Sequence, residues 1–287
     1  MMLSALAALV LVAAPTAKAA SQPAAWTAPF PPHRIADGLY YVGTRGLASF
    51  LITTSKGHIL INSNLESTVP LLRASVEKLG FRMGDVKILL ASHAHSDHVE
   101  AHATIKALTG ARVYVMKGDD QVVASGGKGQ YFYDAHWKPC PVDRVLSDGE
   151  QVTLGEATLV ARRTPGHTRG CTTWTLRAHD ATRTYDTVIV GSPNVNDGYR
   201  LVDNAAYPEI AADYQKSFAL WRALPCDLFL GAHGDYYGME AKHARLGQPG
   251  SNPFVDPQGY RAYIEDREKA FRRTLDEQTR AAKKPVN

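Results

Sequence analysis

The chain has 287 residues, of which 45% are hydrophobic and 21% are charged, and its formal net charge at pH 7 is +4. This composition indicates a globular protein with a large core, and it contains no long acidic or basic block. Nucleic-acid binding would need a clustered basic face, which scattered basic pairs do not supply, so we expect no nucleic-acid partner. The pairs are Arg162-Arg163, Arg272-Arg273 and Lys283-Lys284.

The first twenty residues differ from the rest of the chain. Residues 3–14 are apolar and are followed by Pro15 and by small residues that end in Ala17-Lys18-Ala19. This pattern is typical of a secretory signal peptide, and the apolar stretch is too short to span a membrane. We therefore expect a signal peptide over 1–19, a single mature domain over 20–287, a periplasmic location and no stable membrane association. The alternative is an uncleaved, disordered tail.

The number and spacing of the cysteines say less about the protein than its first twenty residues do. There are three, none in a C-x-x-C pair, which argues against a structural zinc knot. An odd number in an exported protein leaves at least one thiol free or paired outside the chain. They are Cys140, Cys171 and Cys226.

Hydrophobic patterns predict strands and helices in alternation along the first half of the chain. Capping residues and glycines mark the expected helix ends, with Ser67 as a cap and Gly80 and Gly110 as stops. The expected elements are strands at 38–43 and 48–63 with a hairpin turn at Gly57, a helix at 67–80, a strand at 86–92, a helix at 98–110 and a strand at 111–117.

The second half reads as a short helix and loop followed by strands and two further helices. The loop around 130–137 and the segment 26–33 are candidate hydrophobic walls of a cleft. The expected elements are a helix and loop in 118–144, strands over 144–168 with hairpins at 147–149 and Gly155, strands at 171–180 and 182–192, a helix at 207–224, a strand at 226–234 and a charged helix at 256–284 with Asp256 near its start. Together they predict two packed sheets covered by helices, an α/β sandwich.

Four metal-ligand side chains occupy six residues directly after the apolar run 86–92, in the motif His93-Ala94-His95-Ser96-Asp97-His98. That run is expected to be a buried strand, so the ligands emerge from the end of a rigid element. Imidazole and carboxylate together favour zinc, or less specifically iron or manganese.

Two further histidines, His167 and His233, each follow a predicted buried strand and have glycine close by. With them the candidate ligands number six. Six are too many for one tetrahedral catalytic zinc, which has three protein ligands and an open position. They suit two metal ions with three protein ligands each.

Beyond these residues, several segments resemble the metallo-β-lactamase superfamily, and specifically its subclass B3. The motif at 93–98 identifies the superfamily. The segment GHTRGCTTWT, together with histidine at the third ligand position, narrows the resemblance to the subclass. The resemblance extends from about Phe30 to the C-terminal helix and is carried by 93–98, 164–176, 191–204, 228–234 and 252–265.

The resemblance implies a four-layer αβ/βα sandwich with a dinuclear metal site at the strand ends between the two sheets. It implies two Zn²⁺ per chain, one bound by His93, His95 and His167 and the other by Asp97, His98 and His233. Asp97 would also orient the attacking hydroxide. Ser192 stands where many hydrolases of this fold carry a bridging aspartate, and Ser192 and Asn194 would bind the substrate carboxylate; the alternative is that both are turn residues.

The implied function is zinc-dependent hydrolysis of the β-lactam amide bond in penicillins, cephalosporins and carbapenems by a metal-bound hydroxide, conferring antibiotic resistance. The substrate is a small molecule, and we expect a monomer. The chain departs from the family at 99–102, after His233, and at Tyr260, where many relatives have a cysteine that pairs with one at the Cys226 position.

Three alternatives stay open from the sequence. Another exported metallohydrolase of the same fold, a lactonase or thioesterase, would carry an aspartate at the Ser192 position. A nucleic-acid-processing hydrolase of this fold would need a basic face. A zinc-binding protein with a decayed site would have lost ligands, and all six are present.

Overall fold

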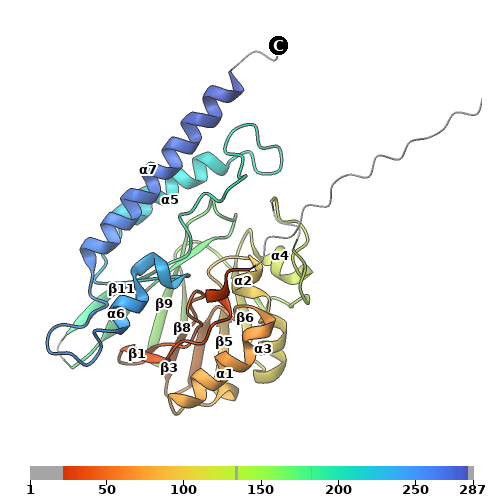
Figure 1. Ribbon diagram of the computed structural model, residues 1–287. Coiled ribbons are helices and arrows are strands. Elements are labelled where there is room, and N and C mark those ends of the chain that lie inside the picture. Colours follow the sequence, from red (N-terminus) through yellow and green to blue (C-terminus); the bar gives the residue numbers. More distant parts are fainter. Residues whose placement is uncertain (1–21, 133–134, 182, 284–287) are drawn as a thin grey trace, which may run out of the picture.

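A computed structural model describes residues 22–132, 135–181 and 183–283 (Figure 1). The expected signal peptide at 1–19 lies outside these residues, so export stays a prediction. Within the described part, no helix has the length and apolar character needed to cross a membrane.

The strands form two sheets. The larger sheet has the order β1 to β7, and the smaller has the order β12-β11-β10-β9-β8. The larger sheet consists of β1 (His33–Ala36), β2 (Leu39–Tyr41), β3 (Phe50–Thr54), β4 (Gly57–Ile61), β5 (Val86–Leu90), β6 (Arg112–Met116) and β7 (Arg144–Leu146). The smaller consists of β8 (Glu150–Leu154), β9 (Ala157–Arg163), β10 (Thr172–His179), β11 (Thr184–Val190) and β12 (Leu228–Gly231).

Helices lie outside the two sheets, with α1 and α3 beside the larger sheet and α5 and α7 on the opposite side of the molecule (Figure 1). The α-helices are α1 (Val69–Lys78), α2 (Ser96–Val99), α3 (His102–Thr109), α4 (Asp120–Ser125), α5 (Ile210–Ala223), α6 (Met239–His243) and α7 (Pro257–Ala282). Short 3-10 turns are η1 (Ala24–Trp26), η2 (Glu66–Thr68), η3 (Met83–Asp85) and η4 (Gly234–Tyr237).

Alternating side chains of the larger sheet enter two separate cores. In β4, Ile59 and Ile61 pack into the core shared with the smaller sheet, whereas Leu60 packs into the core beneath α1 and α3. The first core also contains Trp174 of β10 and Phe218 of α5. This period of two is what a sheet that is covered on both faces requires. The architecture is therefore the four-layer α/β/β/α sandwich that we expected.

Two expected local features are wrong, and non-local contacts explain both. The turn at 147–149 is not a hairpin, because β7 pairs in parallel with β6 in the larger sheet and β8 pairs with β9 in the smaller. The expected helix at 98–110 is split into α2 and α3. At the break, the Ala101 N–H donates to the Asn64 carbonyl (3.1 Å).

Other expected turns and helix ends lie close to their predicted positions in the chain. Gly57 and Gly155 lie in β-hairpin turns, and Gly110 ends α3 with φ 69°. Asp256 caps α7 by accepting a hydrogen bond from the Gly259 N–H (2.9 Å). Ser67 is not a helix cap, because the chain enters α1 through the 3-10 turn η2 and Thr68 takes the cap position.

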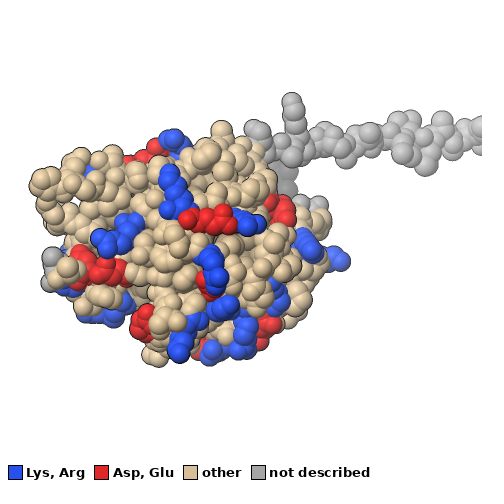
Figure 2. All heavy atoms as spheres, turned by 90° about the horizontal axis from the view of Figure 1, so that it is seen from below, with Lys and Arg blue, Asp and Glu red and all other residues tan. Residues whose placement is uncertain are grey.

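Charges of both signs are interspersed on the face shown in Figure 2, with basic side chains more frequent along its lower edge. Surface side chains of opposite charge form ion pairs such as Arg34–Asp37 (3.0 Å) and Arg82–Asp85 (2.8 Å). Exposed pairs of this kind contribute little to stability. They indicate a solvated surface.

Candidate metal centre

The six candidate ligands converge at one edge of the two sheets. His93 and His95 follow β5 of the larger sheet, and Asp97 and His98 lie in α2 directly after them. His167 follows β9 and His233 follows β12 in the smaller sheet. Because β9 and β11 both run antiparallel to β10 and β12 runs parallel to β11, the ends of β9, β11 and β12 meet at the same edge.

His93, His95 and His167 form one group of possible ligands. Each offers a ring nitrogen, and these atoms lie within 4.8 Å of one another. The ring centroids are nearly equidistant, at 4.8 Å for His93–His95, 4.6 Å for His93–His167 and 4.7 Å for His95–His167. Three imidazoles arranged in this way can bind one ion between them.

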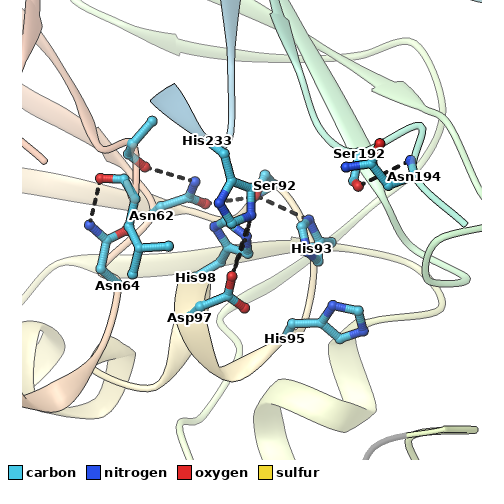
Figure 3. A network of polar contacts seen from close by, with 12 residues as sticks. Asn62, Asn64, Ser92, His93, His95, Asp97, His98, Ser192, Asn194 and His233 are labelled. Carbon is cyan, nitrogen blue, oxygen red and sulfur yellow. Dashed lines mark hydrogen bonds and ion pairs between the residues drawn. The ribbon is translucent and has the colours of Figure 1, made fainter. Parts of the chain in front are cut away.

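Asp97, His98 and His233 form the second group, and their ligand atoms are closer still. His98 Nε2 lies 3.1 Å from His233 Nε2 and 3.2 Å from Asp97 Oδ2, and His233 Nε2 lies 3.4 Å from Asp97 Oδ2. Figure 3 shows His233 reaching down toward His98 and Asp97 from the strand above them. Three ligand atoms at such similar separations can bind one metal ion together.

Burial favours the protonation states that bind metal. Burial lowers the pKa of His167 and His233 to about 4 and also lowers the pKa of His93 and His95. Burial alone would raise the pKa of Asp97, but the neighbouring imidazoles, chiefly His98, hold it well below its usual value. Neutral imidazole and ionised carboxylate are the forms that ligate metals.

The His167 ring is held by hydrogen bonds behind it. His167 Nδ1 lies 2.7 Å from the Asn194 carbonyl, which fixes this nitrogen as the donor and turns Nε2 toward the centre. Tyr131 and Tyr199 both donate from their hydroxyls to the His167 carbonyl (2.8 and 3.1 Å). The sequence placed Tyr131 only in a candidate wall of the cleft and did not single out Tyr199, because neither tyrosine stands next to a ligand in the chain.

Asp119 is a buried residue of the site that the sequence did not single out. Its Oδ2 accepts hydrogen bonds from Ala94 N and Thr168 Oγ1, both at 2.7 Å, and its Oδ1 accepts one from Gly170 N at 2.7 Å. Ala94 lies between His93 and His95, whereas Thr168 and Gly170 follow His167. One carboxylate thus joins the two loops that carry the first ligand group.

Asn62 and Asn64 support the loop that carries His93 and His98 in a similar way. Both adopt left-handed backbone conformations (φ 65° and 57°), which asparagine accommodates better than most residues. Asn62 Oδ1 accepts from Ser92 N (2.8 Å; Figure 3), and Asn64 N donates to the His98 carbonyl (3.3 Å). Their position directly after the buried strand β4 is a signal that sequence analysis could have used.

Five of the six candidate ligands, all except His98, line a cavity of about 420 Å³. The lining confirms part of the expected walls, because Trp26, Gln130 and Ala135 belong to it. Trp137 is buried in the core beneath α1 and α3, and Tyr131 packs under His167. The described lining residues are Gln22, Trp26, His93, His95, Ser96, Asp97, Gln130, Ala135, His167, Asn194, Asn196, His233, Asp235 and Tyr236.

Ser192 and Asn194 lie differently from each other. Asn194 lines the cavity, but Ser192 is fully buried and does not. The Ser192 hydroxyl lies 3.2 Å from the Tyr236 hydroxyl, which also accepts from Asn194 Nδ2 (2.9 Å). In this conformation the Ser192 hydroxyl is linked to the cavity through Tyr236 and Asn194, and its contact with a substrate stays a prediction.

The departures from the family pattern are accommodated inside the fold. His102 is fully buried, and its Nδ1 lies 2.7 Å from the Ser63 hydroxyl. Tyr260 donates from its hydroxyl to the Trp221 carbonyl (2.8 Å), and Cys140, Cys171 and Cys226 are free thiols.

With this geometry established, the family model described as "Metallo-beta-lactamase superfamily" matches residues 42–233, a span that includes all six candidate ligands. The chain therefore belongs to the metallo-β-lactamase superfamily.

Solved structures of metallo-β-lactamases resemble the whole fold. Native FEZ-1 metallo-β-lactamase from Legionella gormanii is 49% identical, with 88% of this chain and 98% of that chain covered and a TM-score of 0.87. BJP-1, a subclass B3 enzyme of Bradyrhizobium japonicum, is 35% identical with 91% and 99% coverage and a TM-score of 0.84. The class B3 di-zinc enzyme LRA-12 from an Alaskan soil metagenome is 33% identical with 88% and 97% coverage and a TM-score of 0.85.

Curated sequence relatives are more distant. A hydroxyacylglutathione hydrolase of Fuscovulum blasticum is 27% identical over 180 residues, which are 63% of this chain and 59% of the relative. The chain thus spans less than two thirds of that relative. The fold and the structural neighbours identify a hydrolase with a metal-binding site.

Proposed function

We propose that this protein is a β-lactamase that uses two Zn²⁺ ions to hydrolyse the amide bond of penicillins, cephalosporins and carbapenems. The observation that carries the proposal is the likeness to FEZ-1, at 49% identity over 88% of the chain. The absence of an aspartate at Ser192 supports it further, because the lactonase and thioesterase alternatives predict an aspartate there.

The donor set fits zinc. A tetrahedral zinc with ligands at about 2.0–2.1 Å separates the ligand atoms by about 3.3–3.4 Å. The atoms of Asp97, His98 and His233 are 3.1, 3.2 and 3.4 Å apart. We assign His93, His95 and His167 to the first zinc and Asp97, His98 and His233 to the second. Three ligands each leave an open position for water and substrate, as in catalytic sites.

Bound zinc supplies a Lewis acid for the carbonyl oxygen and lowers the pKa of water toward neutrality. The protein's own residues orient the reactants. Asp97 faces His98 and His233 with Oδ2, so its other oxygen, Oδ1, can accept a hydrogen bond from the attacking water. Asn194, which lines the cavity, can donate from its side-chain amide to the substrate carboxylate.

Ultraviolet-monitored hydrolysis of a carbapenem and a cephalosporin tests the proposal. The purified protein is assayed with zinc, with a chelator and after zinc is restored. We expect ring opening that the chelator abolishes and zinc restores. His233→Ala should abolish it too, and His179→Ala, which changes an exposed histidine outside the centre, should not. No turnover with two zinc ions bound per chain would refute the proposal.

A thioesterase or lactonase is the second candidate. The likeness to a hydroxyacylglutathione hydrolase, 27% over 180 residues, favours it. Under this alternative, the zinc-loaded protein would hydrolyse an S-acyl glutathione or a lactone and leave the β-lactams intact. The same preparation, assayed on all three substrate classes, separates the candidates.

We also propose export by residues 1–19, a periplasmic mature monomer and a contribution to antibiotic resistance. Expression with and without 1–19 in a susceptible bacterium tests export and resistance together. We expect the full chain alone to raise the inhibitory concentration of a β-lactam, with an N-terminus near Ala20 in the periplasmic fraction. Light scattering of the purified protein measures its molar mass in solution and so tests the monomeric state.

A further inference from the structure

The rim of the cavity carries a carboxylate that the proposed reaction does not use. Asp235 lies in η4, two residues after His233, and its side chain lines the cavity. No Lys or Arg occurs among the described lining residues, and the other polar groups of the rim include amides such as Gln22, Gln130 and Asn196. The outer part of the cavity is therefore negatively charged at Asp235.

Asp235 and its neighbour Glu240 differ in whether a basic side chain pairs with their carboxylates. Glu240 lines an adjoining cleft and forms an ion pair with Arg45 (2.6 Å). Within the described part of the chain, no Lys or Arg lies within ion-pair distance of the Asp235 carboxylate. Arg267, whose charge reaches Asp235, is itself paired with Asp266. The backbone N–H groups of Asp235 and Tyr236 donate to the Asp235 carboxylate, but no cationic side chain of the described residues forms an ion pair with it.

Two aromatic rings line the cavity together with Asp235. The Trp26 ring centroid lies 5.9 Å from that of His233, and the Tyr236 ring centroid lies 5.0 Å from it. Aromatic faces attract organic cations, and a nearby carboxylate adds to this attraction. Trp26 is half-buried, whereas Tyr236 is only 9% exposed, so the Asp235 carboxylate and the Trp26 ring are the main groups that could meet a quaternary ammonium group, and Tyr236 adds a smaller part of the lining.

Both rings are held in place. The residue before Trp26 accepts a hydrogen bond from Gly46 N (2.8 Å), and a Cβ at Gly46 would come within 2.9 Å of Trp26 Cδ1. Tyr236 stacks on Tyr263 with centroids 5.2 Å apart, and its hydroxyl is bound by Asn194. A ligand would therefore meet a preformed surface, which lowers the entropic cost of binding.

We propose that Asp235, Trp26 and Tyr236 form a subsite for a permanently positive substituent of the substrate. This inference rests on the proposed β-lactamase function. Asn194 and the second zinc would hold the substrate carboxylate, and the subsite begins two residues beyond His233. The favoured substrates are then cephalosporins with a quaternary ammonium group at C3, the ring position next to the carboxylate.

Two cephalosporins with the same acyl side chain test the subsite, one with a neutral acetoxymethyl group at C3 and one with a quaternary ammonium-methyl group. A rim charge pair and a cation–π contact together predict a KM about three- to tenfold lower for the charged compound. Asp235→Asn should remove this difference and leave kcat nearly unchanged. Glu277→Gln, which changes an exposed carboxylate of α7 outside the cavity lining, should preserve it, and high salt should weaken it in the wild type.

A binding measurement makes the test independent of turnover. Trp26 is half-buried and lines the cavity, whereas Trp137, Trp174 and Trp221 are buried, so a change in tryptophan fluorescence caused by a ligand in the cavity comes mainly from Trp26. Benzyltrimethylammonium should change the fluorescence of the zinc-loaded protein more strongly than benzyl alcohol, and Asp235→Asn should reduce its affinity about three- to tenfold.

The outcomes separate the two proposals. If neither cephalosporin is hydrolysed, the β-lactamase function fails, and the fluorescence titration alone decides whether the cation subsite exists. If both are hydrolysed with equal KM values and Asp235→Asn changes neither KM nor the titration, the subsite is overturned and the β-lactamase function stands.

Discussion

At the scale of single residues, the best-defined support of the centre is Asp119. Its carboxylate accepts three hydrogen bonds of 2.7 Å from two loops, and only 2% of the residue is exposed. All three partners are donors, so the site requires two acceptor oxygens. This requirement singles out an ionised carboxylate.

Asp119→Asn therefore replaces one acceptor by an amide that faces a donor. A buried donor left without an acceptor costs about 1–3 kcal/mol. Because the strain falls on the loops of His93, His95 and His167, we expect the first metal to be bound about 10- to 100-fold more weakly, as for other supports of metal ligands. Competition with a chromophoric chelator measures this affinity.

The neighbouring Asp120 provides the control for Asp119→Asn. Asp120 accepts from Gly118 N (2.9 Å) within its own turn and contacts neither metal-binding loop. Asp120→Asn should leave both metal affinities unchanged. Equal metal affinity in Asp119→Asn and the wild type would show that the carboxylate does not position the loops.

At the scale of elements, the start of α7 combines a cap with a buried ion pair. Asp256 caps the helix and pairs with Lys242 of α6 (2.9 Å), whose side chain is only 5% exposed and lies over the rings of Phe229 and Tyr237. Asp256→Ala removes both interactions and leaves a buried charge unpaired, so we expect a loss of about 2–4 kcal/mol in the free energy of unfolding.

Asp256→Asn separates the two contributions, because asparagine also caps helices and lacks the charge. We expect its loss to be about 1 kcal/mol smaller than that of Asp256→Ala. Asp266→Ala, which breaks an exposed pair with Arg267, should stay within about 1 kcal/mol of the wild type. Urea unfolding measures all three, and equal values for Asp256→Ala and Asp256→Asn would rule out the cap.

The sequence predicted elements well where the signal is local. The period of two in β4 and the glycine at the end of α3 need only neighbouring residues to be recognised. The turn at 147–149 is not a hairpin because β7 and β8 join different sheets. The break between α2 and α3 occurs where the Ala101 N–H donates to the Asn64 carbonyl. Likewise, the burial of Ser192 follows from Tyr236, which comes from a turn 44 residues further along the chain. Such pairings are set by the fold.

At the scale of the whole molecule, the centre depends on both sheets being fixed to each other. Thr172 N donates to the Ser92 carbonyl (2.7 Å), and Trp174 Nε1 donates to the Ala91 carbonyl (3.0 Å), so β10 of the smaller sheet binds the backbone just before His93. Ala48 N bonds to the Ala232 carbonyl (3.0 Å) beside His233. These contacts explain why ligands from distant segments meet accurately.

The same packing buries histidines outside the centre and makes stability depend on pH. Burial lowers the pKa of His33 to about 4, and His243, whose ring centroid is 4.7 Å away, lowers it further; the hydrogen bond to the Pro31 carbonyl acts in the opposite direction. The His33 ring stacks on Tyr41 and Phe254. In the unfolded chain the pKa returns to about 6.5.

Between pH 6.5 and 4 the unfolded chain thus binds a proton at His33 that the folded protein does not bind. Stability from this residue is complete above pH 6.5 and falls by about 1.4 kcal/mol per pH unit as the pH decreases to 4. His33→Phe keeps the stacked ring and removes the titration, so its unfolding free energy should fall less steeply than that of the wild type. His179→Gln, at an exposed position on β10, should follow the wild-type curve. Urea unfolding at several pH values between 7 and 4 gives these slopes, and parallel curves for the wild type and His33→Phe would contradict the assignment, because a buried neutral imidazole must separate them.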